Sequence, residues 1–202
     1  MQIALPELSA PATLILDRER GISDEEYLAF CEANPNLRLE RTAKGEIIIA
    51  PPAGGESDHR CADAIYQLYA WAKENRRGQA FGSSVEFLLP NGAALSPDAA
   101  WVSNERLSAL TKQQRKQFLR VAPEFVIEVL SPRDRLADAR RKMREWLANG
   151  VELAWLIDGD ARSVHVYRQS RELTIHTGIE RLAGEGPVAG FEIELGDIWE
   201  GL

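Results

Sequence analysis

The feature that most constrains the fold of this chain is an apolar run, FVIEVL (125–130), interrupted by one carboxylate, Glu128. A run that is apolar at successive positions is typical of a central strand covered on both faces. Side chains alternate along a strand, so Glu128 is expected on the same face as Val126 and Leu130. A carboxylate there loses its hydration, and an unpaired buried charge is very costly. Glu128 must therefore be paired, protonated or bound to a cation.

A strand–helix–strand unit is built around this run. Residues 134–149 have helical spacing and stop at Gly150, the residue type favoured just after a helix. The next apolar strand is expected at 152–158. Two consecutive strands joined by a helix predict a parallel pair with a crossover connection.

The remaining elements predict a mixed sheet. Further strands are expected at 37–40, 46–52, 84–90, 97–102, 163–169 and 172–177, with turns at 42–45 and 91–92. Helices are expected after a cap at Ser23 or Asp24, from about 58 to 76 with Gly78 as its terminator, and over 104–120. The order of elements predicts an α/β protein with a mixed central sheet flanked by helices and with extra hairpins.

The chain length suits one sizeable domain, since 202 residues are too few for two comfortable ones. Residues 1–21 have no clear periodicity and contain early breakers, so we expect an extended N-terminal arm. Residues 22–202 are then expected to form a single domain. No signal peptide or bilayer-spanning segment is expected. Cys31 and Cys61 lack the spacing of a zinc site and are interpreted as reduced thiols of a cytoplasmic protein.

The formal net charge of −7 argues against broad, non-specific binding to nucleic acid, which usually needs a basic surface. It leaves room for a local basic groove. The locally basic residues are Lys112, Arg115, Lys116 and Arg120, followed by Arg133, Arg135, Arg140, Arg141, Lys142 and Arg144. The alternative interpretation of each group is a solvated helix face.

Asp98, at the start of a predicted strand, raises the same question as Glu128. Two carboxylates on neighbouring strands are sufficient to anchor Mg²⁺, which typically takes one or two carboxylates and keeps several waters. The pair would then lie within roughly 4–6 Å of each other. The alternative is that Glu128 pairs with an arginine and Asp98 caps a turn.

Lys142, on the helix after Glu128, lies at the edge of that helix's apolar stripe, roughly 100° from Met143. A lysine in this place can run its stem along the core and present its ammonium near the end of the sheet. We expect that ammonium within roughly 3–5 Å of the Glu128 or Asp98 carboxylate. The alternative is a surface pair between Lys142 and Asp138, one turn earlier.

Longer segments of the chain resemble a known family. Pro97-Asp98, then Glu128, then a nearby basic residue is similar to the signature of PD-(D/E)XK nucleases. The more specific segments are LERTAKGEIIIAPPAGGES, LPNGAALSPDAAWV, PEFVIEVLSP and KMREWLANGVELAWLID. From about residue 22 to the C-terminus the chain resembles the bacterial "putative restriction endonuclease" family of that superfamily.

This resemblance implies a site. Asp98 and Glu128 would bind the metal, with the Val129 carbonyl as a third protein ligand. Leu130 stands where the superfamily's usual lysine would be, and Lys142 matches members in which the lysine has moved to the following helix. Glu40 matches an additional acid near the first hairpin. The resemblance implies Mg²⁺ as cofactor, with Mn²⁺ as an alternative, DNA as partner and a homodimer.

Three functions remain open from the sequence. The first is an endonuclease that hydrolyses DNA phosphodiester bonds with Mg²⁺, acting through metal-assisted chemistry. The second is a binding or regulatory module that keeps the nuclease fold without turnover, and the third is a metal-dependent hydrolase of another phosphate ester. His59 could contact a phosphate or the metal, or could be a solvated residue near a helix start. His165 and His176 are interpreted as structural. Arg140 and Arg141 are expected to tolerate alanine far better than Lys142 at the chemical step, and any effect that they have is expected mainly on salt-dependent DNA affinity.

Overall fold

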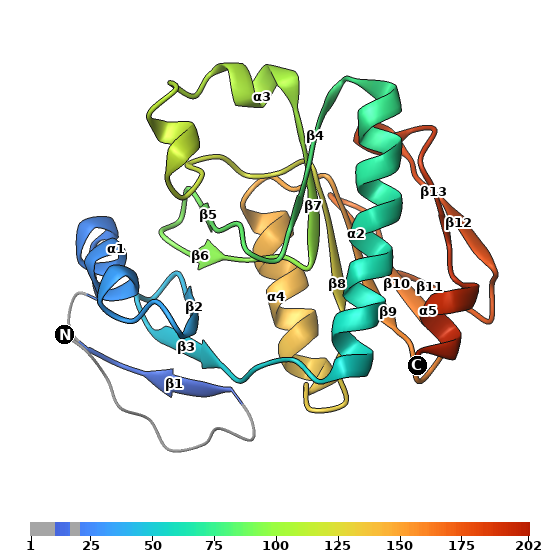
Figure 1. Ribbon diagram of the computed structural model, residues 1–202, viewed down its shortest axis with the longest axis horizontal. Coiled ribbons are helices and arrows are strands. Elements are labelled where there is room, and N and C mark those ends of the chain that lie inside the picture. The colour runs from blue at the N-terminus through green and yellow to red at the C-terminus, as the bar shows by residue number, and fades with distance from the viewer. Residues whose placement is uncertain (1–10, 17–20) are drawn as a thin grey trace.

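The computed structural model describes residues 11–16 and 21–202 (Figure 1). Within them, the larger sheet has six strands in the order β11-β10-β9-β8-β7-β4. They are β4 (Gly78–Gly82), β7 (Ala99–Ser103), β8 (Phe125–Val129), β9 (Leu153–Asp158), β10 (Ser163–Arg168) and β11 (Thr174–Thr177). Neighbours β8 and β9 are parallel, and the other neighbouring pairs are antiparallel. The predicted mixed sheet and the parallel strand–helix–strand unit are therefore confirmed.

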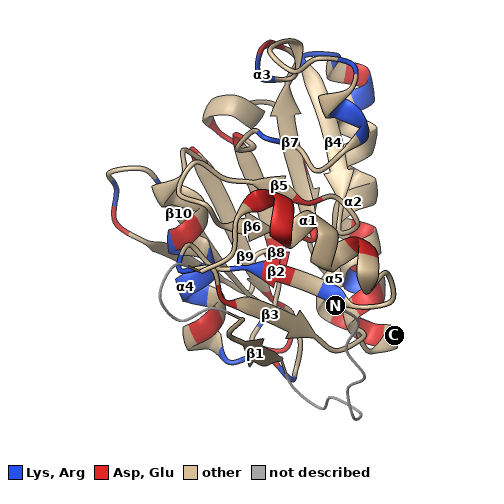
Figure 2. Cartoon of the chain, turned by 90° about the vertical axis from the view of Figure 1, so that its left-hand side faces the viewer, with Lys and Arg blue, Asp and Glu red and all other residues tan. Residues whose placement is uncertain are grey.

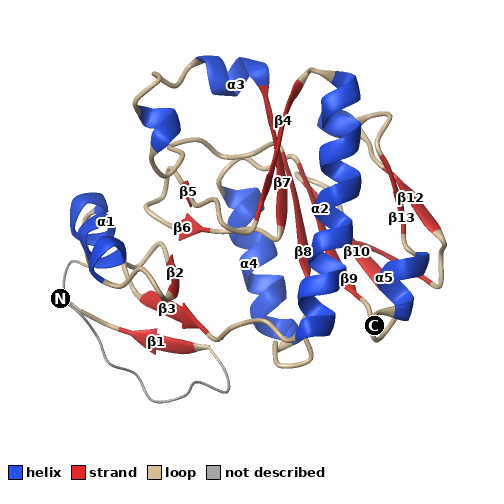
Figure 3. Cartoon of the chain, in the orientation of Figure 1, coloured by secondary structure: helices blue, strands red, loops and turns tan. Residues whose placement is uncertain are grey.

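One helix packs on each face of this sheet, as Figure 3 shows for α2 (Gly55–Asn75) and α4 (Leu136–Ala148). The alternation of β8 explains the arrangement. Phe125 and Ile127 pack in a core cluster with α2, whereas Val126 packs in a second cluster with α4. Both faces of β8 are thus dry, as its continuous apolar sequence predicted.

A smaller antiparallel sheet lies beside the larger one, near the N-terminus in Figure 1. Its described strands, in spatial order, are β1 (Ala12–Leu14), β3 (Ile47–Ala50), β2 (Arg38–Arg41), β6 (Ala94–Leu95) and β5 (Phe87–Leu88). Helix α1 (Asp24–Ala33) packs on it through Tyr27 and Phe30. Ser23 caps α1 in a reciprocal box with Glu26, so the predicted helix start is confirmed.

The remaining elements are short. They are α3 (Asn104–Ser108), a 3-10 helix (Gln114–Lys116), β12 (Arg181–Ala183), a 3-10 helix (Gly186–Val188), β13 (Glu192–Glu194) and α5 (Gly196–Glu200). Strands β12 and β13 pair with each other as a hairpin. No helix in the described part of the chain is both long and apolar enough to cross a membrane.

Two predicted elements differ from the structure. The expected helix over 104–120 is only α3 followed by a single 3-10 turn, because Thr111 and Gln114 exchange backbone–side-chain hydrogen bonds that start a new turn. Residues 104–120 have no apolar stripe that would hold a long helix against the core. The strand expected over 84–90 is reduced to β5.

The predicted end of α2 at about residue 76 is confirmed, but the role of Gly78 as its terminator is wrong. The helix ends at Asn75, and Arg76 takes the left-handed conformation with φ 58°. Gly78 instead begins β4, where a Cβ atom would lie 2.3 Å from the carbonyl oxygen of Val102. Glycine is thus required there by the close approach of β7, and not by the end of a helix.

The N-terminal arm expected at 1–21 lies largely outside the described residues, since 1–10 and 17–20 are not described. Within it, Ala12–Leu14 forms β1 and pairs antiparallel with Ile47–Ile49 of β3.

Candidate active site

Asp98 lies immediately before β7, and Glu128 lies on the adjacent strand β8 of the larger sheet. Ala99 of β7 is paired with Ile127 of β8, so the next pair in the same register is Asp98 with Glu128. The Asp98 carboxylate accepts a hydrogen bond from the Val129 backbone N–H at 2.8 Å. Burial raises the pKa of Asp98, although the charge of Lys142 opposes this. The arrangement on neighbouring strands is the one that the sequence predicted.

Glu128 faces α4 and is held by two groups of that helix. Only 9% of the residue is exposed. The indole Nε1 of Trp146 donates to Oε1 of Glu128 at 2.8 Å, and Nζ of Lys142 lies 2.9 Å from the same oxygen. Val126 and Leu130 pack in the cluster on the same face, as alternation predicted. The charge of Glu128 is paired by a lysine, not by an arginine.

Lys142 is at the centre of the site. Its ammonium donates to the Ser96 carbonyl at 2.8 Å and lies 2.8 Å from Oε1 of Glu40. With Glu128, these contacts use all three N–H donors of the ammonium. The predicted approach of Lys142 to the acids is thus present. Asp138 does not pair with Lys142 but with Arg141, at 2.7 Å.

Glu40 comes from the other sheet. It lies on β2, and its Oε1 also accepts the Ser96 backbone N–H at 3.0 Å. Ser96 therefore contacts both Glu40 and Lys142, through its N–H and its carbonyl. The site is formed where the edge of the smaller sheet meets the ends of β7 and β8.

The site carries an excess of negative charge. Burial, together with the nearby charges of Asp98 and Glu40, raises the pKa of Glu128 to about 8, against the opposing effect of Lys142. Burial alone would lower the pKa of Lys142, but the carboxylates of Glu128 and Glu40 raise it. Three acids thus lie around one lysine, and the raised pKa values of Asp98 and Glu128 mean that these two hold a proton more tightly than usual. A further cation would relieve this repulsion.

The residues present fit a hard divalent cation. The described part of the chain contains no group of three or more His, Cys, Asp or Glu side chains that could hold a metal. Two carboxylates, Asp98 and Glu128, are nevertheless what Mg²⁺ commonly takes from a protein. Leu130 donates its N–H to β9, so the backbone groups of its neighbour Val129 face Asp98. The Val129 carbonyl is therefore on the correct side for a third ligand.

Sequence reasoning missed the site roles of Trp146 and Ser96, and it left the role of His59 undecided. Trp146 was assigned only to the apolar stripe, yet its N–H fixes Glu128. Its position four residues after Lys142, on the same flank of the helix, was the available signal. Nothing in the sequence pointed to Ser96. His59 lies exposed on α2.

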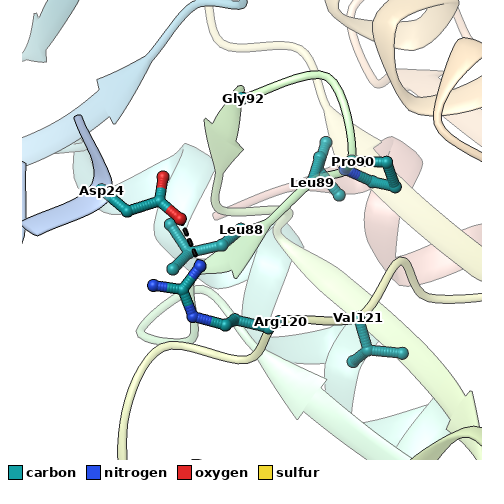
Figure 4. A pocket seen from close by; sticks show the side chains of 7 residues that line it. All are labelled: Asp24, Leu88, Leu89, Pro90, Gly92, Arg120 and Val121. Carbon is teal, nitrogen blue, oxygen red and sulfur yellow. Dashed lines mark hydrogen bonds and ion pairs between the residues drawn. The ribbon is translucent and has the colours of Figure 1, made fainter. Parts of the chain in front are cut away.

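A separate pocket lies between α1 and the β5–β6 hairpin (Figure 4). It is lined by Asp24, Leu88, Leu89, Pro90, Gly92, Arg120 and Val121. Asp24 and Arg120 form an ion pair there, and Asp24 also pairs with the buried Arg41. This pocket contains none of the site residues described above, and its charged groups already pair with each other.

Comparison with known proteins agrees with the fold. A profile of the Uma2 family, described as "Putative restriction endonuclease", matches residues 24–196. The structure is similar to the crystal structure of a "putative nuclease belonging to DUF820" from Anabaena variabilis, with a TM-score of 0.74 and 21% sequence identity. The similarity covers 89% of this chain and 98% of that one, which confirms the predicted restriction-endonuclease-like fold. No curated protein matches the sequence.

Proposed function

Because the chain belongs to the Uma2 family, described as "Putative restriction endonuclease", we propose that it is a metal-dependent endonuclease that hydrolyses DNA phosphodiester bonds. One observation carries this proposal. The Lys142 ammonium lies 2.9 Å from Glu128 and 2.8 Å from Glu40, at the sheet end that also carries Asp98. A buried cluster of acids with one cation, at the ends of two central strands, suits metal-assisted hydrolysis of a phosphate ester.

The metal would be held by Asp98, Glu128 and the Val129 carbonyl. Mg²⁺ is the expected ion, and Mn²⁺ would suit the same oxygen ligands. When bound, the ion supplies Lewis acidity and makes water a better nucleophile. Trp146 keeps Glu128 in one orientation through its 2.8 Å hydrogen bond, and Val129 does the same for Asp98. Both carboxylates are therefore preorganised.

Lys142 would act on the phosphate. Positive charge aimed at phosphoryl oxygens stabilises the charge that develops in the transition state. Glu40 contacts the ammonium and is itself held by Ser96, so it serves to keep the lysine directed at the site. We propose Lys142 as the catalytic cation and Glu40 as its positioning residue.

The test is cleavage of supercoiled plasmid DNA with Mg²⁺ or Mn²⁺, compared with the same reaction in EDTA. Calorimetry with each ion, run in parallel, measures binding independently of cleavage. The proposal expects saturable divalent binding and nicked or linear plasmid only when the ion is present. A protein that binds neither ion contradicts it.

A specific observation favours a second candidate, a nuclease-fold module without turnover. All three donors of Lys142 are already used by protein acceptors, so none is free for a phosphate. The net charge of −7 also disfavours tight DNA binding. If the protein is an active nuclease, a metal ion that binds Glu128 would free the Lys142 N–H that now donates to this carboxylate. DNA binding without cleavage in either ion would favour the module.

We also propose a homodimer, because cutting both strands of a duplex needs two sites and symmetric pairs are common. Sedimentation at several protein concentrations tests this state. Cys31 and Cys61 are free thiols, in keeping with our proposal that the protein acts in the cytoplasm.

A further inference from the structure

Two arginines of α4 lie on the flank of the helix that faces away from Lys142. Arg140 and Arg144 are one turn apart, and Arg140 is roughly 200° around the helix from Lys142. Figure 2 shows the basic segments of α4 in blue, on the helix that lies beside the strands. Helix α4 packs on β9 and β10, so these arginines are on its β10 side.

Buried polar groups of β10 lie under these arginines. His165 and Tyr167 are 5% and 7% exposed and alternate onto the α4 face of the sheet. Burial raises the pKa of Tyr167, and the charges of Arg140 and Arg144 oppose this. Burial lowers the pKa of His165, with a further lowering from Arg140 and an opposing effect of Asp158. Arg140 therefore lies close to both β10 side chains, and Arg144 lies close to Tyr167.

Two polar atoms of this cluster have no partner among the described residues. Nε of Arg140 and Nδ1 of His165 are buried without a hydrogen bond to any of them, whereas the Tyr167 hydroxyl lies beside the Arg140 guanidinium. Within the described part of the chain, no carboxylate lies at ion-pairing distance from Arg140 or Arg144. Their neighbour Arg141 differs, because it pairs with Asp138. A buried unsatisfied donor such as Nε of Arg140 is costly. A guanidinium without a carboxylate partner has its donors available for a bidentate, charge-assisted bond to an anion.

The register of the sheet relates this cluster to the candidate active site. Glu128 is paired with Leu156 of β9, and Leu156 is paired with His165 of β10. Two strand spacings of about 4.8 Å separate Glu128 from His165, a distance of roughly 10 Å. One DNA strand rises about 3.4 Å per nucleotide, so a few nucleotides span that distance.

We propose that Arg140 and Arg144, supported by Tyr167, form a phosphate-binding site for the DNA backbone a few nucleotides from the bond that is cut. This inference rests on the proposed function. Arg144 is exposed and contacts the phosphate directly, whereas Arg140 is partly buried and is oriented by the β10 side chains. Arginine suits this role because its planar fork binds phosphate oxygens in pairs.

The experiment measures binding of a fluorescent duplex by anisotropy in EDTA, over a series of salt concentrations. Arg144→Ala should weaken binding about tenfold at low salt, the loss expected for one charge-assisted hydrogen bond. Its plot of log affinity against log salt should be shallower by about 0.9, the value for one phosphate contact. The matched control is Arg141→Ala, on the same helix but paired with Asp138, which should stay within about twofold.

Arg140→Gln should give a similar loss, with thermal unfolding measured beside it because Arg140 is partly buried. Divalent binding by calorimetry should be unchanged in both variants. Equal salt dependence of Arg144→Ala and wild type overturns this inference and leaves the proposed nuclease standing. A wild type that does not bind the duplex overturns both. If inorganic phosphate binding is lost in Arg144→Ala while duplex binding is unchanged, the occupant is a free phosphate and the DNA assignment is wrong.

Discussion

Lys142 is the residue whose replacement best separates chemistry from structure. Among the described residues, its ammonium is the one cation that contacts both Glu128 and Glu40. If it stabilises the transition state, Lys142→Ala should slow plasmid cleavage about 100- to 1000-fold under single-turnover conditions at saturating DNA. The matched control is Arg141→Ala, whose side chain is exposed and paired with Asp138. Normal cleavage by the lysine variant would leave the site without its proposed cation.

Glu128 allows a test of the metal ligand. Its pKa is raised to about 8, so the folded protein favours the neutral carboxyl more than the unfolded chain does. Glutamine imitates that state and can still accept from Trp146. Glu128→Gln should therefore keep or raise the melting temperature at pH 7, while abolishing divalent binding by calorimetry. A strongly destabilised variant that still binds Mg²⁺ would make Glu128 a structural partner of Lys142 only.

At the scale of elements, the central strands and the crossover helix could be predicted because their patterns are long and apolar. FVIEVL, the α4 stripe and the strand at 153–158 are each read from local periodicity alone. Strand β4 could not be predicted, because Gly78 and Gly82 are residues typical of turns and helix ends, and because its pairing with β7 is non-local. The length of the helix after residue 104 was predicted wrongly, because side-chain hydrogen bonds of Thr111 and Gln114 compete with the helical backbone bonds.

Gly78 tests the packing of β4 on β7. A Cβ there would lie 2.3 Å from the Val102 carbonyl oxygen and 2.6 Å from the Trp101 ring, and neither can move easily in a paired strand. Gly78→Ala should lower the free energy of unfolding by about 1–3 kcal/mol or more, measured by urea denaturation. The control is Gly55→Ala at the start of α2, where a Cβ would meet only the end of Leu202 at 3.6 Å. If both variants unfold alike, the close approach at β4 is wrong.

At the scale of the whole molecule, the candidate site joins two sheets that the sequence shows only as separate hairpins and strands. Glu40 reaches Lys142 across the boundary between the sheets, and the sequence separation of the two gives no sign of that contact. The resemblance to the family suggested Glu40, whereas periodicity alone did not. Ser96 and Trp146 went unassigned because their roles depend on backbone and indole hydrogen bonds formed only after folding.

The boundary between the sheets also contains Glu86, a carboxyl that is 6% exposed and accepts a hydrogen bond from the Tyr27 hydroxyl of α1. Burial raises its pKa from 4.5 to about 7, with a smaller raising effect of Glu40 and opposing effects of Tyr27, Arg41 and Lys142. The folded protein therefore binds this proton more tightly than the unfolded chain does. Stability from this group is full below pH 4.5 and is lost as the pH rises to about 7.

Glu86→Gln keeps an acceptor for Tyr27 and removes the titration. It should match wild type near pH 4.5 and exceed it at pH 8 by up to about 3 kcal/mol in the free energy of unfolding. Other buried acids, such as Asp98, titrate in both proteins, so the difference between the two urea curves isolates Glu86. The measurement needs at least one pH on each side of the window and one within it. A difference that is constant with pH would mean that Glu86 is ionised in the folded protein throughout, held as a carboxylate by Arg41 and Lys142.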